Sequence, residues 1–550
     1  MFEQSNEPIA EPTPKAHREF SAIETIFAWI CFLIGYAYCR VFPAVVNPFG
    51  GFLFVIALFT LTAILLHVKG VKLLGMPLVA LITAVLMASS LLFSSNEFIH
   101  FFAYAYCLAT FGYFVFISFG NSAGRGFHNL FLLDYFKALL VMPFQSFFAL
   151  FRGAFSGNGK INGRFLGKIL LGIAIAVIPT ATILVLLSYD SGFTDIIIDI
   201  LDFGFGDLLG HLGSLILGIP IGMYVYGLFI ASADKKASHI WTAQQCDTLA
   251  KRVKIAPTLT VLSAVLPVLA VYVIFFISQW KYYVSGFVGQ LPDATSYAEY
   301  AREGFFQLCT VSVINFLIIM AIGLFTKQNK EKPPIIQRIL TIVLSLFTLV
   351  LITTAIAKMA LYIHRYGLTQ KRVYATWFMG VLTLLFIMVI VKQFLKRFKV
   401  LAIGGAIVVC SFMLLSFANT DQMIVEYNVD RYLDGSISSF DTDAMEELGD
   451  AAIPGMVRLV TTLDRIYGTN LLDFQNQRGS MTSMKYYQYR DVCASLYRTA
   501  YLRDRDLWQT TIPKLRADAA LKKCGITQSV EEWTQSVKDQ DRFPDRAYLH

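Results

Sequence analysis

The chain has 550 residues, of which 56% are hydrophobic and 15% are charged, and its mean hydropathy is +0.58. Soluble domains average about 45–50% apolar and about 25% charged residues, so a soluble enzyme and a disordered chain are both excluded. The net charge of +8 divides into +12 for residues 1–418 and −4 for residues 419–550. We therefore predict a membrane domain followed by a polar domain, and we attribute the basic balance to membrane topology rather than to nucleic-acid binding.

Apolar runs of about 20 residues, the length that crosses a bilayer core, predict an all-α fold with about eleven transmembrane helices. A polar N-terminal tail, residues 1–20, precedes the first run, which we expect to be an uncleaved helix. The transmembrane domain covers residues 21–418, with runs near 21–41, 50–68, 73–95, 98–119, 165–188, 211–232, 256–280, 304–326, 337–361, 373–391 and 399–418.

Lys and Arg are concentrated in alternate loops, which predicts the orientation of the helices. The cation-rich set includes the loops with Lys69 and Lys72, with Lys235 and Lys236, and with Lys392 and its neighbours. On the opposite side, residues 189–210 contain five Asp and no Lys or Arg. We therefore expect a multi-pass protein of the bacterial inner membrane with a cytoplasmic N-terminus and an extracytoplasmic C-terminal domain. The cations at 364–372 oppose this pattern: either they have a structural or lipid-binding role, or one span is miscounted.

Two further segments, 126–155 on the cytoplasmic side and 193–212 on the outer side, mix apolar and charged residues and are predicted to be interfacial amphipathic helices. Pro143 interrupts the first of them. An acidic loop on the outer side is a candidate site, although its spacing matches no known metal-binding motif. Its members are Asp190, Asp195, Asp199, Asp202 and Asp207.

Residues 419–550 are predicted to form a small soluble helical domain of about 130 residues, large enough to hold its own core. Asp441 or Thr442 can cap a helix, Pro454 suits the first turn of the next one, and a long helix is expected near 484–503. Cys493 and Cys524 form a disulfide if this domain is outside the cytoplasm, but two unpaired buried thiols are an equal alternative.

Ionisable groups near the membrane segments are the main functional candidates, because a charge is costly to bury there. The densest group, residues 297–304, contains Glu299, Arg302 and Glu303, which share one helical surface. It binds a cation, pairs with Lys358 across the outer rim or takes part in proton transfer, or it is an ion-paired helix start at the membrane interface. Lys358 either extends its amine to the headgroups or contacts a ligand.

Two features inside the spans are interpreted as packing devices rather than as sites. Asn315 can hydrogen-bond a neighbouring helix, and Gly218 and Gly222 have the GxxxG spacing that permits close helix contact. No phosphate-binding loop, nucleophile elbow or zinc-ligand spacing is present in the sequence, so we predict no metal and no cofactor.

Several motifs resemble those of a family of uncharacterised bacterial polytopic membrane proteins known only as a domain of unknown function. The motifs are YAEYAREGFF at 297–306, LSYDSGF at 187–193, YGLTQKRVYA at 366–375 and NVDRY at 428–432. The resemblance covers roughly residues 165–460 and implies a conserved outer cluster, but it implies no activity. That cluster is Glu299, Arg302, Arg365, Lys371 and Arg372, which leads to the hypothesis of an external ion-paired network that anchors the C-terminal domain.

Three functions remain open. The first is a non-enzymatic envelope sensor or assembly protein that presents an external helical domain to a protein partner, with membrane lipids as its surroundings. The second is a transporter or permease for a small solute or ion, suggested by Lys358 and by prolines in the spans. The third is a transferase acting on a lipid-linked substrate, in which Arg365 and Arg372 hold a phosphate. An enzyme is the less favoured class.

Overall fold

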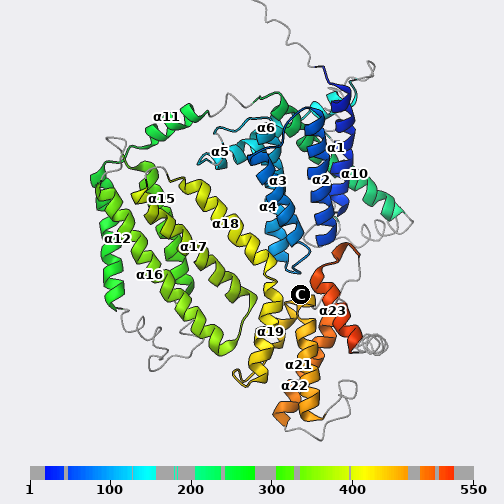
Figure 1. The fold of residues 1–550 in the computed structure, drawn as a ribbon, viewed down its shortest axis with the longest axis vertical. Helices are drawn as coiled ribbons and strands as arrows, with labels where there is room; N and C mark the ends of the chain where they lie inside the picture. The colour runs from blue at the N-terminus through cyan, green and yellow to red at the C-terminus, as the bar shows by residue number, and fades with distance from the viewer. Residues whose placement is uncertain are drawn as a thin grey trace, which may run out of the picture. The chain divides into compact units, whose positions relative to one another are not determined.

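The computed structural model describes residues 19–41, 47–124, 126, 128–156, 205–236, 242–278, 305–327, 335–395, 398–468, 483–501 and 507–524, with isolated positions between 157 and 204. Over these residues the chain is helical and has no β-strand, only an isolated bridge between Ala256 and Thr326, which confirms the all-α class (Figure 1). The chain divides into two compact units, Met1–Arg40 with Leu140–Lys236, and Val41–Leu139 with Ala237–His550.

Within the described residues, nine helices are long and apolar enough to cross a membrane, so the protein is a multi-pass membrane protein. They are α1 (Ala22–Val41), α2 (Pro48–Val68), α4 (Glu97–Ser118), α10 (Phe205–Ala233), α12 (Thr258–Ser278), α15 (Phe305–Phe325), α16 (Ile335–Tyr366), α17 (Gln370–Phe394) and α18 (Val400–Phe417). Each corresponds to a predicted run. The predicted run at 165–188 lies almost entirely outside the described residues, so the count of eleven stays a prediction.

One predicted span is shorter than expected. The run at 73–95 forms α3 (Met76–Ser90), an apolar helix of 15 residues. At 1.5 Å per residue it extends about 22 Å, less than the roughly 30 Å of a bilayer core. Gly75 precedes it with φ of +72° and Pro77 occupies its first turn, while three consecutive carbonyls after Met87 accept turn hydrogen bonds that end it.

The first unit consists of α1, α10 and the short helices α6 (Met142–Gln145) and α7 (Ala149–Ala154). Gly218 lies so close to Gly35 that a Cβ on Gly218 would be 2.5 Å from the backbone carbon of Gly35, and Gly222 is similarly close to Cys31. The small side chains thus allow the α1 and α10 backbones to touch, which confirms the packing interpretation of the GxxxG sequence. The Tyr226 hydroxyl donates to the carbonyl of Glu24 at 3.2 Å across this contact.

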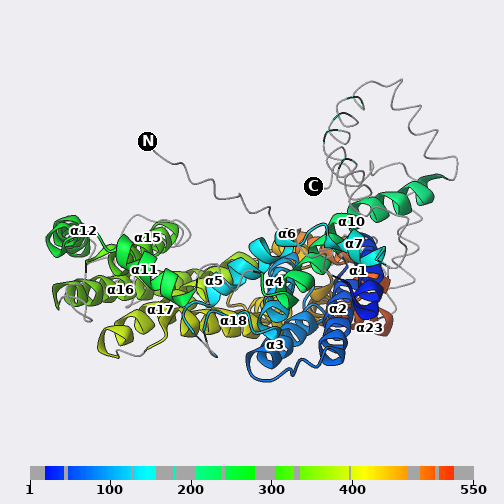
Figure 2. The same ribbon diagram turned by 90° about the horizontal axis from the view of Figure 1, so that it is seen from above.

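The second unit contains the remaining membrane helices. α3 packs against α4, and α16 packs between α15 and α17, with α12 beside it; Figures 1 and 2 show α12, α15, α16 and α17 side by side. Helix α11 (Ala243–Val253) starts at a capping box in which Thr242 and Gln245 exchange hydrogen bonds. The core of α15, α16 and α17 is formed by large apolar side chains such as Phe305, Leu351 and Phe386.

The C-terminal helices also belong to the second unit. They are α19 (Thr420–Leu433), α20 (Thr442–Glu446), the 3-10 turn Gly449–Ala451, α21 (Ile453–Tyr467), α22 (Ser483–Tyr501), the 3-10 turn Leu507–Gln509 and α23 (Ile512–Lys523). The Oδ1 of Asp441 caps α20 and Pro454 lies in the first turn of α21, as predicted. These helices share a core of their own that includes Val425, Met456 and Leu496. We call them the C-terminal bundle.

The segment 126–155, predicted to be amphipathic and interrupted at Pro143, forms several short helical elements. It contains α5 (Phe131–Phe136), a π-helical turn at Lys137–Val141, and then α6 and α7. Pro143, which has no N–H to donate, lies in the first turn of α6 directly after the π-helical turn, and this helical run ends at a turn over 146–148 before α7. Whether these short helices lie in the membrane interface stays a prediction.

Candidate functional site at the base of the C-terminal bundle

The loop between α16 and α17 binds α19 through a reciprocal pair of hydrogen bonds. The N–H of Leu368 donates to Oδ1 of Asn428 at 2.8 Å, and Nδ2 of Asn428 donates to the carbonyl of Leu368 at 2.8 Å. Asn428 is buried, so losing this side chain would leave two main-chain groups without partners, which costs more than the bonds themselves contribute. One amide side chain therefore ties the loop to the C-terminal bundle.

The conformation of this loop depends on Gly367. Its φ is +78°, in the left-handed region that glycine adopts at no steric cost. A Cβ at this position would also collide with Oδ1 of Asn428. The YGL segment of the motif therefore turns sharply enough to present the main chain of Leu368 to Asn428.

Arg372 binds two main-chain carbonyls at the start of the same loop. Its Nη1 donates to the carbonyl of Tyr366 at 3.0 Å and to that of Gly367 at 2.5 Å. The guanidinium carbon lies 4.2 Å from the centroid of the Tyr362 ring, a cation–π contact. These contacts give the basic residue in this loop a structural role. The carboxylates that were predicted as its partners, Glu299 and Glu303, lie outside the described residues, as does Arg302, so the ion-paired network stays a prediction.

A buried carboxylate lies where three helices begin. Asp421 in the first turn of α19 accepts a hydrogen bond from Nε2 of Gln370 at 3.1 Å, and Gln370 is the first residue of α17. The side chain of Asn96 also hydrogen-bonds Asp421, while its Oδ1 caps α4 by accepting from the N–H groups of Phe98 and Ile99. Asp421 therefore connects the starts of α4, α17 and α19.

Burial raises the pKa of Asp421 to about 6, because removal from water disfavours the charged form, and the hydrogen bonds from Gln370 and Asn96 oppose this only in part. Asp421 is 2% exposed. Its protonation state consequently changes close to neutral pH, at the point where the C-terminal bundle meets the membrane helices.

Apolar contacts and a main-chain bond complete the junction. Leu368 and Val373, on either side of the start of α17, pack against the core of the C-terminal bundle. The N–H of Ile512, at the start of α23, donates to the carbonyl of Leu92 at the end of α3 at 2.7 Å. We define the junction as the contacts of Asn96, Leu368, Gln370, Asp421 and Asn428. In Figure 1, α18 leads directly into α19 at this place.

The remaining cations of the predicted outer cluster are spread along two helices. Lys358 lies half-buried within α16, Arg365 is exposed at its last turn, and Lys371 is exposed in the first turn of α17. Of the four cations, Arg372 is the one that the structure places against the carbonyls of the α16–α17 loop beside the junction.

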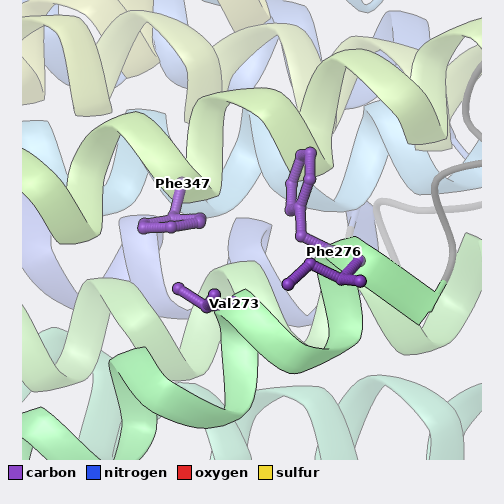
Figure 3. Close-up of a pocket in the computed structure, with 4 residues that line it drawn as sticks. Val273, Phe276 and Phe347 are labelled. Carbon is purple, nitrogen blue, oxygen red and sulfur yellow. The ribbon is translucent and has the colours of Figure 1, made fainter.

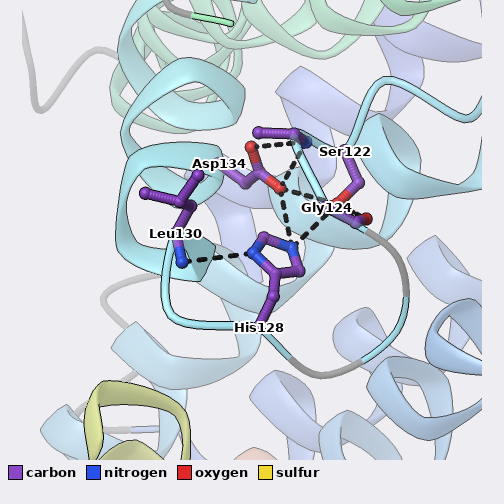
Figure 4. Close-up of polar contacts among 6 residues, drawn as sticks. Ser122, Gly124, His128, Leu130 and Asp134 are labelled. Carbon is purple, nitrogen blue, oxygen red and sulfur yellow. Dashed lines mark hydrogen bonds and ion pairs between the residues drawn. The ribbon is translucent and has the colours of Figure 1, made fainter. Parts of the chain in front are cut away.

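A second polar cluster lies in the loop between α4 and α5 (Figure 4). The Ser122 hydroxyl donates to Oδ2 of Asp134 at 2.7 Å, and the N–H of Ala123 contacts both oxygens of Asp134 at 3.1 Å. Nε2 of His128 lies 3.0 Å from Oγ of Ser122 and 3.3 Å from Oδ2 of Asp134. Asp134 is completely buried.

These residue types match a hydrolase triad, but their geometry does not. The N–H of Leu130 donates to Nδ1 of His128 at 3.2 Å, so Nδ1 carries no hydrogen and the neutral ring has its hydrogen on Nε2. Neither nitrogen can then accept the proton of Ser122, which is already donated to Asp134. A triad instead has the aspartate on Nδ1 and the serine on Nε2. The cluster therefore holds the loop in shape and does not activate a nucleophile.

Asn315 forms a polar contact inside the spans. Its Oδ1 accepts from the Tyr272 hydroxyl of α12 at 2.6 Å, and its Nδ2 donates to Oγ1 of Thr348 of α16 at 2.9 Å. The predicted interhelical role of Asn315 is thus confirmed: its fully buried side chain joins three helices.

The other predicted site residues are only partly within the described residues. Of the acidic loop, Asp190, Asp195, Asp199 and Asp202 lie outside them, and Asp207 lies near the start of α10. Cys493 is buried in the core of the C-terminal bundle and Cys524 is at its edge; both are free thiols in the structure, and the disulfide stays a prediction. Burial raises the pKa of the Cys493 thiol to about 12, which suppresses its thiolate.

No group of three or more metal-binding side chains occurs among the described residues. Sequence reasoning missed Asn96 and Asp421, because a single Asn or Asp before or in the first turn of a helix has the ordinary signature of a cap. Asn428 is the first residue of the NVDRY motif. Its partner is the main chain of Leu368, and a main-chain partner cannot be recognised from the types of side chains in a sequence.

The profile of a protein family described as a domain of unknown function (DUF4153) matches residues 81–459. This range includes the second half of α3, all of α4, the loop between α16 and α17, α19 and the start of α21. It therefore contains every residue of the junction. No curated protein and no solved structure matches the chain.

Proposed function

The chain belongs to the DUF4153 family, and we propose that it is a non-enzymatic protein of the bacterial inner membrane that holds its C-terminal bundle outside the cytoplasm for sensing or for assembly with a partner protein. The observation that carries this proposal is the reciprocal hydrogen bonding of Asn428 and Leu368 at 2.8 Å. It supports a bundle that is docked on the membrane helices rather than tethered by a flexible linker.

The contacts of the bundle support its extracytoplasmic side. It binds two segments, the α3–α4 connection through Leu92 and Asn96 and the α16–α17 loop through Leu368 and Gln370. Both segments fall on the outer side if the predicted spans alternate from a cytoplasmic N-terminus, although the cations at 364–372 oppose that pattern. The cations that opposed this assignment include Arg372, which binds main-chain carbonyls and a tyrosine ring. These contacts give Arg372 a structural role, which accounts for a cation on the outer side of the membrane.

The polar groups in the described spans and in the loop between α4 and α5 also favour a scaffold over an enzyme. Asn315 is engaged by neighbouring helices, and the serine, histidine and aspartate near residues 122–134 have hydrogen bonds that oppose nucleophilic chemistry. With Asp421 at the junction, the protein has a group that titrates near neutral pH between its membrane helices and its C-terminal bundle. This is a physical basis for sensing.

A transporter is the second candidate, favoured by Pro220 inside α10 and Pro267 inside α12, because a proline within a helix can form a bend. The contact of Gly218 with Gly35 argues for fixed packing of α10. Substrate-dependent flux in proteoliposomes that is lost in Lys358→Ala would favour the transporter over the scaffold.

Topology is tested by labelling introduced cysteines in intact cells with a membrane-impermeant maleimide. Asp443→Cys reports on the C-terminal bundle, and Gln244→Cys in α11 is the matched control, since both native side chains are exposed on helices. The unsubstituted chain, with its eight cysteines, provides the background. We expect Asp443→Cys to react in intact cells and Gln244→Cys only after permeabilisation. The reverse result would show that the bundle is cytoplasmic and that the proposal is wrong.

A further inference from the structure

An open apolar pocket lies between α12 and α16. Val273, Phe276 and Ile277 of α12 and Phe347 of α16 line it, and its volume is about 450 Å³. Figure 3 shows Val273 and Phe276 on one helix and Phe347 on the other, around a common space. The rings of Phe276 and Phe347 are 5.9 Å apart and meet edge to face. All four side chains are apolar and belong to spans, where the surrounding solvent is lipid.

Two cations lie on the same face of α16 as Phe347. Lys358 follows Phe347 by eleven residues and Arg365 by eighteen. Successive residues of an α-helix are rotated by about 100° about its axis. Residues eleven positions apart therefore point within about 20° of each other, and residues eighteen positions apart point in the same direction. Lys358 is half-buried and Arg365 is exposed. The apolar pocket and the two charges therefore form one stripe along the helix.

The spacing of this stripe fits the depth of one membrane leaflet. Eleven residues of α-helix span about 16 Å, and half of a hydrocarbon core is about 15 Å. A phospholipid whose phosphate lies at Lys358 therefore has an acyl chain long enough to reach the pocket.

We propose that this stripe is a binding site for an anionic phospholipid, with an acyl chain in the pocket lined by Val273, Phe276, Ile277 and Phe347 and the phosphate at Lys358 and Arg365. The pocket contributes apolar contact for the chain, and the two cations select a negatively charged headgroup over a zwitterionic one. The proposal assigns the ligand that Lys358 contacts and is independent of the scaffold function.

The test is native mass spectrometry of the full chain in detergent, titrated with phosphatidylglycerol or with phosphatidylcholine of the same acyl chains. We expect tighter retention of phosphatidylglycerol. A cation near a membrane surface contributes about 1 kcal/mol, so Lys358→Gln should weaken phosphatidylglycerol binding about fivefold and leave phosphatidylcholine unchanged. Lys371→Gln is the matched control, because it removes an exposed cation on α17, away from the stripe. Equal retention of the two lipids by the unsubstituted chain would overturn the proposal.

A second measurement examines the acyl-chain pocket in the unsubstituted chain and so does not depend on the folding of a variant. Phosphatidylglycerol with a photoreactive group at the end of its acyl chain should crosslink to peptides that contain residues 273–277 or 347. Val273→Trp should reduce this crosslinking by filling the pocket, without changing any charge. Crosslinks distributed evenly over the apolar helices, unaffected by Val273→Trp, would show only bulk lipid contact and would overturn the proposed site.

Discussion

The side-chain amide of Asn428 forms two hydrogen bonds with the main chain of Leu368. Oδ1 of Asn428 accepts from the N–H of Leu368, and Nδ2 of Asn428 donates to the carbonyl of Leu368, each at 2.8 Å. The two residues are 60 positions apart. Between them lie two membrane helices, α17 and α18. The contact therefore joins a loop at one end of the membrane helices to the first helix of the C-terminal bundle.

Replacing Asn428 should loosen the bundle. Asn428→Ala removes both hydrogen bonds and leaves the main chain of Leu368 unsatisfied in a buried position, at an expected cost of about 1–3 kcal/mol. Asn428→Asp keeps the shape and the acceptor but loses the donor, and it faces the Leu368 carbonyl with a negative charge, so it should be no more stable than Asn428→Ala. Limited proteolysis of the C-terminal bundle and thermal unfolding in detergent measure the loss. Asp443→Ala, at an exposed position, is the control. Unchanged protease resistance in both Asn428 variants would contradict the role of this pair.

Gly367→Ala should destabilise the same junction for a different reason. The residue would be forced to keep a φ of +78°, which costs an L-residue roughly 1–2 kcal/mol, and its Cβ would displace Asn428. Gly380→Ala is the matched control, since that glycine lies in α17 with open space around its Cβ position and alanine favours a helix by up to about 1 kcal/mol.

The two variants at residues 367 and 428 should also be coupled. In the Asn428→Ala background the steric part of the Gly367→Ala cost disappears, so the double variant should be more stable than the sum of the single losses indicates. Thermal unfolding of the four chains gives the coupling. Additive losses would mean that Gly367 acts only through its own backbone.

The stability of the junction should depend on pH through Asp421. Its pKa is raised from 3.8 to about 6 in the folded protein, so the folded state binds the proton more tightly than the unfolded state. The resulting stabilisation is fully present below pH 3.8 and is lost as the pH rises to about 6, with an upper magnitude of about 3 kcal/mol. We expect the C-terminal bundle to resist proteolysis better at pH 5 than at pH 7.5.

Asp421→Asn provides the control for this pH effect. The asparagine is neutral at both pH values, and its Oδ1 can still accept the hydrogen bond from Gln370. It should therefore remove most of the difference between pH 5 and pH 7.5. A pH dependence of unchanged size in Asp421→Asn would assign the effect to other groups.

The contact between α1 and α10 should be sensitive to a single methyl group. In Gly218→Ala the new Cβ would meet the backbone of Gly35 and Tyr36, and backbone cannot move aside as a side chain can, so we expect a loss of about 1–3 kcal/mol. Gly213→Ala, five residues earlier in α10 with open space at its Cβ, should be neutral or stabilising. Thermal unfolding in detergent distinguishes the two, and equal effects would contradict close packing at Gly218.

The all-α class and the nine apolar helices follow from hydropathy, because a chain in lipid must satisfy its main-chain hydrogen bonds within each helix. Local signals also predicted the cap of α20 by Asp441, the place of Pro454 and the close contact at Gly218. Hydropathy did not predict that α3 forms only 15 residues of the run at 73–95, or that a π-helical turn precedes Pro143. The length of an apolar run in the sequence does not predict the residue at which its helix ends.

What the sequence alone determined is therefore the membrane character, most helix positions and the residue types available for chemistry, all of which depend on interactions between near neighbours in the chain. Only the tertiary structure decided that Asp421 is buried among the starts of three helices, that Asn428 binds the main chain of Leu368, and that His128 cannot serve as a base for Ser122. These properties depend on partners brought together by folding, and on burial, which changes the free energy of a charge without changing the residue that carries it.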